Sequence, residues 1–222
     1  MQSQKKTRLP ALAATFAASL MLSAAAITPA AAQDRIEVIL DWFVNPDHGP
    51  IILAEELGYF EEAGLVVDVV APADPTDPPR MVAAGRADIA ISYQPQLHLN
   101  LHQGMPLVRV GTLVSTPLTC LVVLADGPIQ EMTDLAGGKV GFAVAGIQEV
   151  MLDAMLAHHG MSGDDVEQIN IGWSISPALM SGQVDGVIGA FRNFELNQLE
   201  IEGTAGRCFY PENEGIPAYD EL

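Results

Sequence analysis

Short apolar runs alternate with longer segments of helical periodicity from Asp34 to the last residue, and this alternation constrains the fold more than any other feature. Strands that alternate with helices are joined by crossover connections, which produce mostly parallel sheets covered by helices. The sequence therefore predicts an α/β fold. The expected strands are Ile36–Leu40, Val66–Val70, Asp88–Ser92, Leu107–Thr112, Leu118–Leu124, Lys139–Phe142, Val166–Ile171, Asp185–Gly189 and Arg207–Tyr210.

Helical periodicity fills the segments between these runs, and several of the segments end at a glycine. Gly64, Gly85, Gly160 and Gly182 each follow a helical run, a position where the left-handed backbone conformation costs little only for Gly. These glycines support the division into elements. The expected helices are Gly49–Glu62, Pro79–Ala84, Gln96–Gln103, Ile147–His159, Pro177–Ser181 and Asn193–Glu202.

A faint internal repeat relates the two halves of the chain. The stretch Ala84–Ser92 is echoed 97 positions later by Ser181–Gly189, and in both a helix end is followed by Gly and then by Asp before a buried strand. The helix–glycine–strand pattern is common to α/β proteins and could produce such a similarity by itself. Because the echoed units keep their order along the chain, we instead predict two similar lobes.

The repeat also predicts where a ligand binds, because open α/β sheets bind ligands at the carboxyl ends of their strands. Six loops fall there, at 41–48, 71–78, 92–96, 143–148, 172–177 and 190–195. They hold many aromatic and amide side chains, including both tryptophans, which stay available to a ligand in exposed loops. These loop residues include Trp42, Asn45, His48, Tyr93, Gln94, Trp173, Phe191, Asn193 and Glu195.

Two aromatic residues and one carboxylate are the most informative members of this set. Trp42 and Tyr93 could enclose a planar heterocycle between their faces, although Trp42 could equally pack in a core or between lobes. Glu195 could accept from a ring amino group or hold a protonated ring nitrogen. Its alternative role is to compensate the dipole at a helix N-terminus.

The remaining polar candidates have simpler explanations. Asp47 is expected to be the N-cap of a helix, and His48 to satisfy a nearby backbone group, with donation to a ligand as its alternative. His98 and His102 lie one helical turn apart, but no third ligand accompanies them. We therefore predict no metal site.

The first 32 residues have the features of a signal peptide. A basic start is followed by the apolar run Leu9–Ile27 and by Ala30–Ala32, so cleavage before Gln33 is expected. The alternative is an uncleaved membrane anchor, because the apolar run is near spanning length. No Cys stands at the cleavage point to accept a lipid, so we predict a periplasmic protein that is not a lipoprotein.

The net charge and the cysteine content restrict which classes of molecule the chain is expected to bind and which compartment suits it. Removing the signal peptide takes away three positive charges and no negative ones, which changes the formal charge from −18 to −21. Such acidity argues against nucleic acid and anionic membrane surfaces, and it fits a neutral or cationic small ligand. Cys120 and Cys208 are far apart in sequence, and we expect separate core thiols although an oxidising compartment would permit a disulfide.

Three stretches resemble one family of binding proteins. They are DWFVNPDHGP at Asp41–Pro50, SYQPQL at Ser92–Leu97 and GAFRNFE at Gly189–Glu195, and Ala71–Pro79 is also similar. The similarity, from about Asp34 to the last residue, is to the periplasmic binding proteins for the thiamin pyrimidine precursor, hydroxymethylpyrimidine or its formylamino relative, within a thiamin-pyrimidine-synthase-like family.

This resemblance implies a two-lobed type II periplasmic-binding-protein fold that closes on a pyrimidine and delivers it to an ABC permease in the inner membrane. It implies no catalysis and no cofactor, and we expect a monomer. Stacking would fall to Trp42 and Tyr93, and reading of the ring edge to Asn193 and Glu195. The full set of expected ligand-binding residues is Asp41, Trp42, Asn45, His48, Tyr93, Gln94, Phe191, Asn193 and Glu195.

Family members normally continue beyond the equivalent of Leu222, so the segment that completes their first lobe has no counterpart here. We therefore expect the chain to be a fragment or a truncation. The predicted division is a signal peptide at 1–32, lobe 1 at 33–117, a hinge crossover at 118–126 and lobe 2 at 127–222.

Two other functions compete with this interpretation. Fungal relatives that synthesise the pyrimidine need a Schiff-base lysine for pyridoxal phosphate, but the only lysine after the signal peptide is Lys139. A binder of another planar solute, such as a sulfonate, should show Arg or Ser/Thr-rich helix N-termini at its cleft. Only Arg192 qualifies, so both alternatives are less favoured.

Overall fold

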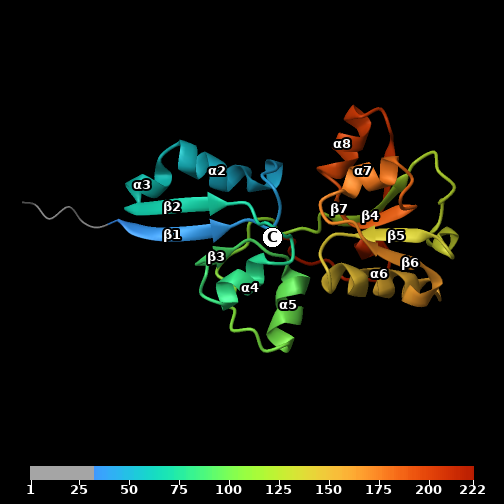
Figure 1. The fold of residues 1–222 in the computed structure, drawn as a ribbon, viewed down its shortest axis with the longest axis horizontal. Helices are drawn as coiled ribbons and strands as arrows, with labels where there is room; N and C mark the ends of the chain where they lie inside the picture. The colour runs from blue at the N-terminus through green and yellow to red at the C-terminus, as the bar shows by residue number, and fades with distance from the viewer. Residues whose placement is uncertain (1–32) are drawn as a thin grey trace, which may run out of the picture. The chain divides into compact units, whose positions relative to one another are not determined.

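The computed structural model describes residues 33–222, and the predicted signal peptide lies outside them. The chain forms two β-sheets with helices on their faces, which confirms the predicted α/β class (Figure 1). The first sheet has the order β2-β1-β3 and the second the order β6-β5-β7-β4-β8. The strands are β1 Asp34–Ile39, β2 Leu65–Val70, β3 Ile89–Ala90, β4 Thr119–Leu124, β5 Lys139–Phe142, β6 Glu167–Asn170, β7 Gly186–Phe191 and β8 Gly206–Phe209.

The helices follow the predicted segments with one interruption. The expected helix Gly49–Glu62 is broken at Gly58, whose φ of 76° ends the first part and starts the second. The α-helices are α2 Gly49–Glu56, α3 Tyr59–Glu62, α4 Pro78–Ala83, α5 Gln94–His102, α6 Ile147–His158, α7 Ile175–Met180 and α8 Glu195–Ile201. Short 3₁₀ helices are η1 Pro46–His48, η2 Met132–Leu135, η3 Gly163–Asp165 and η4 Pro211–Asn213.

The internal repeat is visible in both sequence and structure. β1 lies between β2 and β3, all parallel, and β5 lies in the same way between β6 and β7. Asp88 accepts the backbone N–H of Glu37 at 2.8 Å, and Asp185 accepts that of Lys139 at 2.8 Å. These two aspartates are the ones that the sequence repeat aligns. The same hydrogen bond therefore connects the start of β3 with β1 in one lobe and the start of β7 with β5 in the other.

One expectation about strands was wrong. Leu107–Thr112 forms no strand, because a strand needs a hydrogen-bonding neighbour and no strand lies beside this segment in the described chain. The sheets are mostly parallel, as predicted, and the antiparallel pairings are those of β4 with β7 and β8.

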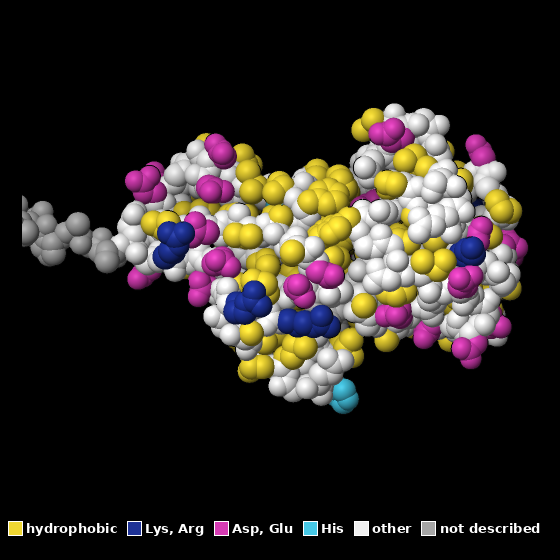
Figure 2. Space-filling model, viewed as in Figure 1, with side chains coloured by type: hydrophobic (Ala, Val, Ile, Leu, Met, Phe, Trp, Pro, Cys, Tyr) yellow, Lys and Arg dark blue, Asp and Glu magenta, His cyan; other side chains and the backbone are white. Residues whose placement is uncertain are grey.

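The second sheet carries most of the core. Alternate residues of β4 face opposite sides: Cys120 and Val122 join a cluster with α7 and α8, whereas Leu121 and Val123 join one with α6. In the first sheet, by contrast, α2 and α3 bury no residue. Figure 2 shows hydrophobic side chains at several places on the visible face, including the middle of the molecule. The exposed large hydrophobic residues of the described chain include Phe43, Val44, Leu53, Leu57 and Tyr59.

Cys120 and Cys208 form a disulfide, with their Cα atoms 5.6 Å apart. The expectation of separate thiols was wrong, because the 88 residues between them say nothing about their distance in the fold. The antiparallel pairing of β4 with β8 places Val122 opposite Cys208, and Cys120 lies two residues away on the same face.

The described residues include no helix long and apolar enough to cross a membrane.

Candidate ligand site

The most buried carboxylate of the candidate site is that of Asp41, directly after β1. It is 2% exposed and receives two side-chain hydrogen bonds, from His48 Nε2 at 2.8 Å and from the Tyr93 hydroxyl at 3.0 Å. Burial, followed by the charge of Asp41, raises the pKa of Tyr93 well above its ordinary value, so its hydroxyl stays protonated and donates. The loops after β1 and β3 are thereby joined, as their predicted place at one sheet edge requires.

His48 is fully buried, and its surroundings fix which nitrogen carries the proton. The backbone N–H of Asn45 donates to Nδ1 at 3.2 Å, so in the neutral ring Nε2 is protonated and donates to Asp41. The simpler explanation given for His48, satisfaction of a backbone group, is therefore correct. The ring also has a second partner in Asp41.

Asn45, rather than Asp47, caps the short helix that follows. Its side-chain oxygen accepts the backbone N–H of Asp47 at 2.9 Å, and its amide donates to the Phe43 carbonyl at 3.3 Å. The prediction for Asp47 was therefore wrong by two positions, because Pro46 starts the helix and the residue before it takes the cap. Asn45 was expected to contact a ligand, and its side chain is engaged in local structure here.

An aromatic cluster surrounds Trp42, which is 6% exposed and joins the core of the second sheet. Its ring centroid lies 4.3 Å from that of Trp173, and Phe43 lies 5.5 Å from Trp42 and 5.9 Å from Phe194. The ring against Trp42 is thus Trp173, not Tyr93. The indole N–H of Trp42 is buried without an acceptor in the described chain.

Glu195 begins α8 and is the buried carboxylate of the second lobe, at 4% exposure. Its Oε2 accepts the backbone N–H of Phe191 at 2.6 Å. Burial raises the pKa of Glu195 to about 7, and the hydrogen bond from Phe191 only partly opposes that rise. The Phe191 ring meets Tyr93 edge-on with centroids 6.2 Å apart, which links this carboxyl to the Asp41 network.

Two predicted site residues, Gln94 and Asn193, form hydrogen bonds with other parts of the chain. The Gln94 side chain accepts the backbone N–H of Asp220 at 3.1 Å, so it holds the segment that follows η4. Asn193 donates to Asp47 Oδ1 at 2.6 Å, which connects the loop after β7 with the loop after β1. Tyr93 and Phe191 form a chain of contacts from Asp41 to Glu195.

Sequence reasoning left two residues out of the site. Trp173 was recognised as a loop aromatic but was not assigned to the ligand, although it lies closest to Trp42. Gln148 gave no sequence signal at all. Its Oε1 accepts the backbone N–H groups of Ala143 at 2.7 Å and Val144 at 3.0 Å, and so shapes the loop after β5.

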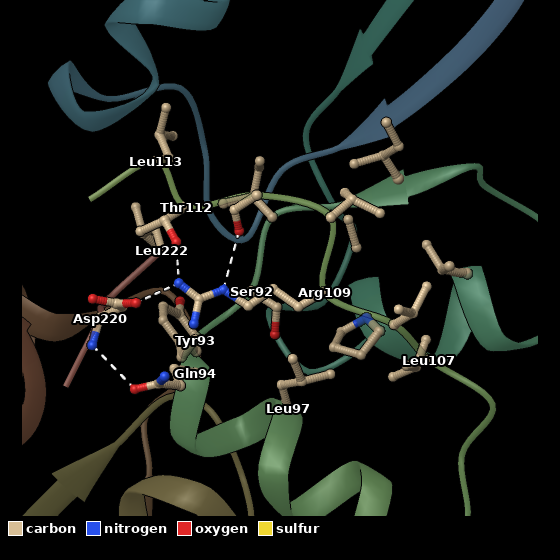
Figure 3. Close-up of a pocket in the computed structure, with 18 of the residues that line it drawn as sticks. Ser92, Tyr93, Gln94, Leu97, Leu107, Arg109, Thr112, Leu113, Asp220 and Leu222 are labelled. Carbon is tan, nitrogen blue, oxygen red and sulfur yellow. Dashed lines mark hydrogen bonds and ion pairs between the residues drawn. The ribbon is translucent and has the colours of Figure 1, made fainter. Parts of the chain in front are cut away.

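The side chains fill the site tightly. A void of about 10 Å³ lies among Asp41, Tyr93 and Val144, too small for more than a water molecule. A cavity of about 390 Å³ lies beside β3, and its lining includes Tyr93 and Gln94 but neither Trp42 nor Glu195 (Figure 3). The buried carboxylates Asp41 and Glu195 both lie outside this lining, so the polar chemistry of the site is not that of the cavity. The described residues hold no cluster of three or more metal-ligating side chains.

The raised pKa of Glu195 predicts a pH-dependent stability. An unfolded Glu titrates near 4.5 and the folded one near 7, so the folded chain holds more protons and loses stability as the pH rises through this window. At about 1.4 kcal/mol per pH unit the loss reaches about 3 kcal/mol. Urea unfolding at pH 4.5 to 8 should show this slope in the wild type and a flatter one in Glu195→Gln.

The exposed Glu200, five residues further along α8, provides the matched control. Glu200→Gln should keep the wild-type slope. Equal slopes for the wild type and Glu195→Gln would contradict the assignment of the titration to Glu195.

Comparison with solved structures shows the class of fold. The chain superposes with a TM-score of 0.65 on the alkanesulfonate-binding protein SsuA from Xanthomonas axonopodis, at 18% identity, over 85% of this chain and 64% of that one. The chain thus has the two-lobed type II periplasmic-binding-protein fold, which confirms the predicted architecture.

Sequence comparison shows the family. A family model described as NMT1/THI5 like matches residues 45–222, and the chain belongs to this family. It is 50% identical over 208 residues to a Haemophilus influenzae protein whose name assigns it to thiamine biosynthesis, over 94% of this chain and 65% of that protein. It is 36% identical to a formylaminopyrimidine-binding protein from Halalkalibacterium halodurans, over 86% of this chain and 58% of that protein.

The 4-amino-5-hydroxymethyl-2-methylpyrimidine phosphate synthase from Schizosaccharomyces pombe is less similar, at 30% identity over 70% of this chain and 45% of that protein. The chain thus spans about two thirds or less of the length of these relatives.

Proposed function

We propose that this protein is the substrate-binding component of an ABC importer and that it captures a thiamin pyrimidine precursor, hydroxymethylpyrimidine or its N-formyl-aminomethyl relative. The observation that carries the proposal is the buried carboxyl of Glu195, which accepts the backbone N–H of Phe191, a residue whose ring meets Tyr93. Burial raises the pKa of Glu195 to about 7, so it can share a proton near neutral pH. Such a group can hold a ring nitrogen or amino group while an aromatic face stacks on the ring.

The relatives support the same ligand class. One of them is named a formylaminopyrimidine-binding protein, and it matches 86% of this chain. The acidic balance of the chain also suits a neutral or protonated aminopyrimidine better than an anion. The proposal includes a periplasmic location, a monomer and an inner-membrane permease as partner, without nucleic acid. The cycle is capture, closure and release, and no bond of the ligand changes.

The sulfonate alternative is disfavoured because the arginine of the site is already paired within residues 33–222. The guanidinium of Arg192 forms a two-point ion pair with Glu212, at 2.5 and 2.9 Å, and also donates to the carbonyls of Leu118 and Thr119. An arginine so occupied has little capacity left for a sulfonate. The synthase alternative lacks a suitable lysine, because Lys139 starts β5 at the end opposite to the loops of the site.

Replacing Trp42 tests the stacking role. Trp42→Ala should weaken binding of hydroxymethylpyrimidine or its formylamino relative by about 1–3 kcal/mol, the range for an aromatic ring stacked on a nucleobase. Binding would be measured by calorimetry and by tryptophan fluorescence, since Trp42 and Trp173 both lie in the aromatic cluster. Methanesulfonate would serve as the competing ligand class.

The exposed Tyr59 on α3 provides the control, and Tyr59→Ala should bind like the wild type. Unchanged affinity in a Trp42→Ala chain that melts cooperatively would refute the stacking role. Binding of methanesulfonate but of neither pyrimidine would refute the ligand class.

A further inference from the structure

Three consecutive residues at the end of β7 have partners in different parts of the chain. The ring of Phe191 meets that of Tyr93 edge-on, with centroids 6.2 Å apart. The Asn193 amide donates to Asp47 at 2.6 Å. Both partners lie in loops that follow strands of the first sheet. Arg192 therefore lies between two residues that contact the first lobe, and its own partners lie elsewhere.

Arg192 holds the crossover, which we define as Leu118 and Thr119, where the chain passes from the elements of the first sheet into β4 of the second. The backbone N–H of Arg192 donates to the Leu118 carbonyl at 2.9 Å, and its Nε donates to the same carbonyl at 3.3 Å. A terminal nitrogen of its guanidinium donates to the Thr119 carbonyl at 3.2 Å. A displacement of Arg192 must therefore move the crossover with it or break these bonds.

The guanidinium of Arg192 is held in one orientation. It forms the two-point ion pair with Glu212, and it lies over the Tyr210 ring, 4.3 Å from the ring centroid. Both partners belong to the segment that follows β8 in the second lobe. A planar guanidinium that is fixed by a carboxylate and a ring directs its remaining N–H groups, and lysine has no equivalent of this geometry.

A second charged group holds the other side of the crossover. Glu221 is 1% exposed and accepts the backbone N–H groups of Leu118 at 2.6 Å and of Thr119 at 2.8 Å. The carbonyls of the crossover thus bond to a cation and its N–H groups bond to an anion. Because hydrogen bonds to charged groups are stronger than neutral ones, the crossover follows its partners as a unit.

We infer that Arg192 is a positioning residue, which couples the arrangement of the ligand site to the crossover between the lobes without touching the ligand. A ligand held by Glu195 fixes the end of β7, because Glu195 accepts the Phe191 N–H, and Arg192 fixes the crossover relative to that end. The coupling is reciprocal, so a chain with its crossover held has more of its population in the binding arrangement and binds more tightly. The ligand part of this inference rests on the proposed function.

Arg192→Met tests the inference, because methionine keeps an unbranched apolar stem and removes every side-chain N–H donor. Arg207→Met is the matched control. Arg207 also lies over an aromatic ring, with its guanidinium carbon 5.1 Å from the Phe209 centroid. Its side-chain hydrogen bonds within residues 33–222 go to Ile129 and Gln130, and not to the crossover.

The first measurement uses the protein without ligand. Spin labels on cysteines introduced at the exposed Glu61 of α3 and Glu200 of α8 report the distribution of distances between the lobes. Arg192→Met should widen this distribution, whereas Arg207→Met should leave it unchanged. A purely structural role of Arg192 would lower the melting temperature without changing the distribution. Circular dichroism and thermal melting verify that both variants fold.

Ligand affinity is the second measurement. Arg192→Met should weaken binding of hydroxymethylpyrimidine or its formylamino relative by about tenfold, within the range for residues that couple two sites without contacting a ligand. Arg207→Met should bind within about twofold of the wild type. Glu212→Gln leaves Arg192 in place and removes the charge of its partner, so it should change both measurements in the same direction by less. It decides the result if Arg192→Met does not fold.

The inference is overturned if a folded Arg192→Met chain keeps the wild-type distance distribution, if it binds the pyrimidine as tightly as the wild type, or if Arg207→Met produces the same changes. With Glu212→Gln as the folded variant, an unchanged distance distribution overturns it. If the wild type binds neither pyrimidine, the proposed function fails, and the distances in the protein without ligand still decide whether Arg192 holds the crossover.

Discussion

Replacing both Cys120 and Cys208 by alanine should lower the free energy of unfolding by about 4 kcal/mol. The disulfide closes a loop with a sequence separation of 88, and a cross-link of this length removes that order of conformational entropy from the unfolded chain. It also joins neighbouring strands, so β8 would lose its covalent attachment to β4. The effect is large against the 5–15 kcal/mol that is usual for the stability of a whole domain.

Urea unfolding followed by circular dichroism provides the measurement. Wild-type protein treated with dithiothreitol should lose about as much stability as the double variant, because both lack the cross-link. The reduced protein keeps the volume of both side chains, and therefore separates the cross-link from loss of packing at Cys120, which is fully buried. A loss below about 1 kcal/mol in both would show that the cross-link contributes little.

Local patterns in the sequence predicted much of the fold. The strand Lys139–Phe142 has the predicted bounds, since a short apolar run with no competing helical period permits one interpretation. The aspartates of the repeat were aligned correctly because each performs the same local task, receiving an N–H from a neighbouring strand. Such features depend on a few residues close in sequence or on one repeated unit.

Features that depend on distant partners were not predictable. Leu107–Thr112 has strand composition, but strand formation depends on a neighbour that its own sequence cannot specify. The pairing of Cys120 with Cys208 depends on the register between β4 and β8. Both errors follow from one physical fact: β structure is completed by residues far along the chain.

In the candidate site, too, the positions of the loops could be predicted from the sequence, whereas the contacts of individual side chains could not. The loops after β1, β3 and β7 meet at the carboxyl ends of strands from the two sheets, as predicted, because strand polarity determines where loops lie. Which side chains remain free in those loops was harder to predict. Asn45 is engaged as a cap and Trp173 lies against Trp42, and both results depend on side-chain geometry that residue type leaves open.

Removing the carboxylate of Asp41 should cost about 3 kcal/mol of unfolding free energy. Asp41→Ala would leave the Nε2–H of the fully buried His48 and the hydroxyl of Tyr93 without their acceptor, and each buried donor without a partner costs about 1–3 kcal/mol. Asp41→Asn keeps the side-chain size and one acceptor oxygen, so we expect a smaller loss. The order of unfolding free energies in urea should be wild type, Asn variant, Ala variant.

The matched control is Asp68, which forms a 2.7 Å ion pair with Arg35 on the surface, where the arginine side chain is 72% exposed. Asp68→Ala should cost less than about 1 kcal/mol, because solvent screens exposed pairs and the arginine can return to water. Equal losses for Asp41→Ala and Asp68→Ala would contradict a buried network. A large loss at Asp41 alone would mean that the polar centre of the candidate site also holds the loops after β1 and β3 together. Variants that probe ligand contacts should then leave Asp41 intact and change the aromatic residues around it.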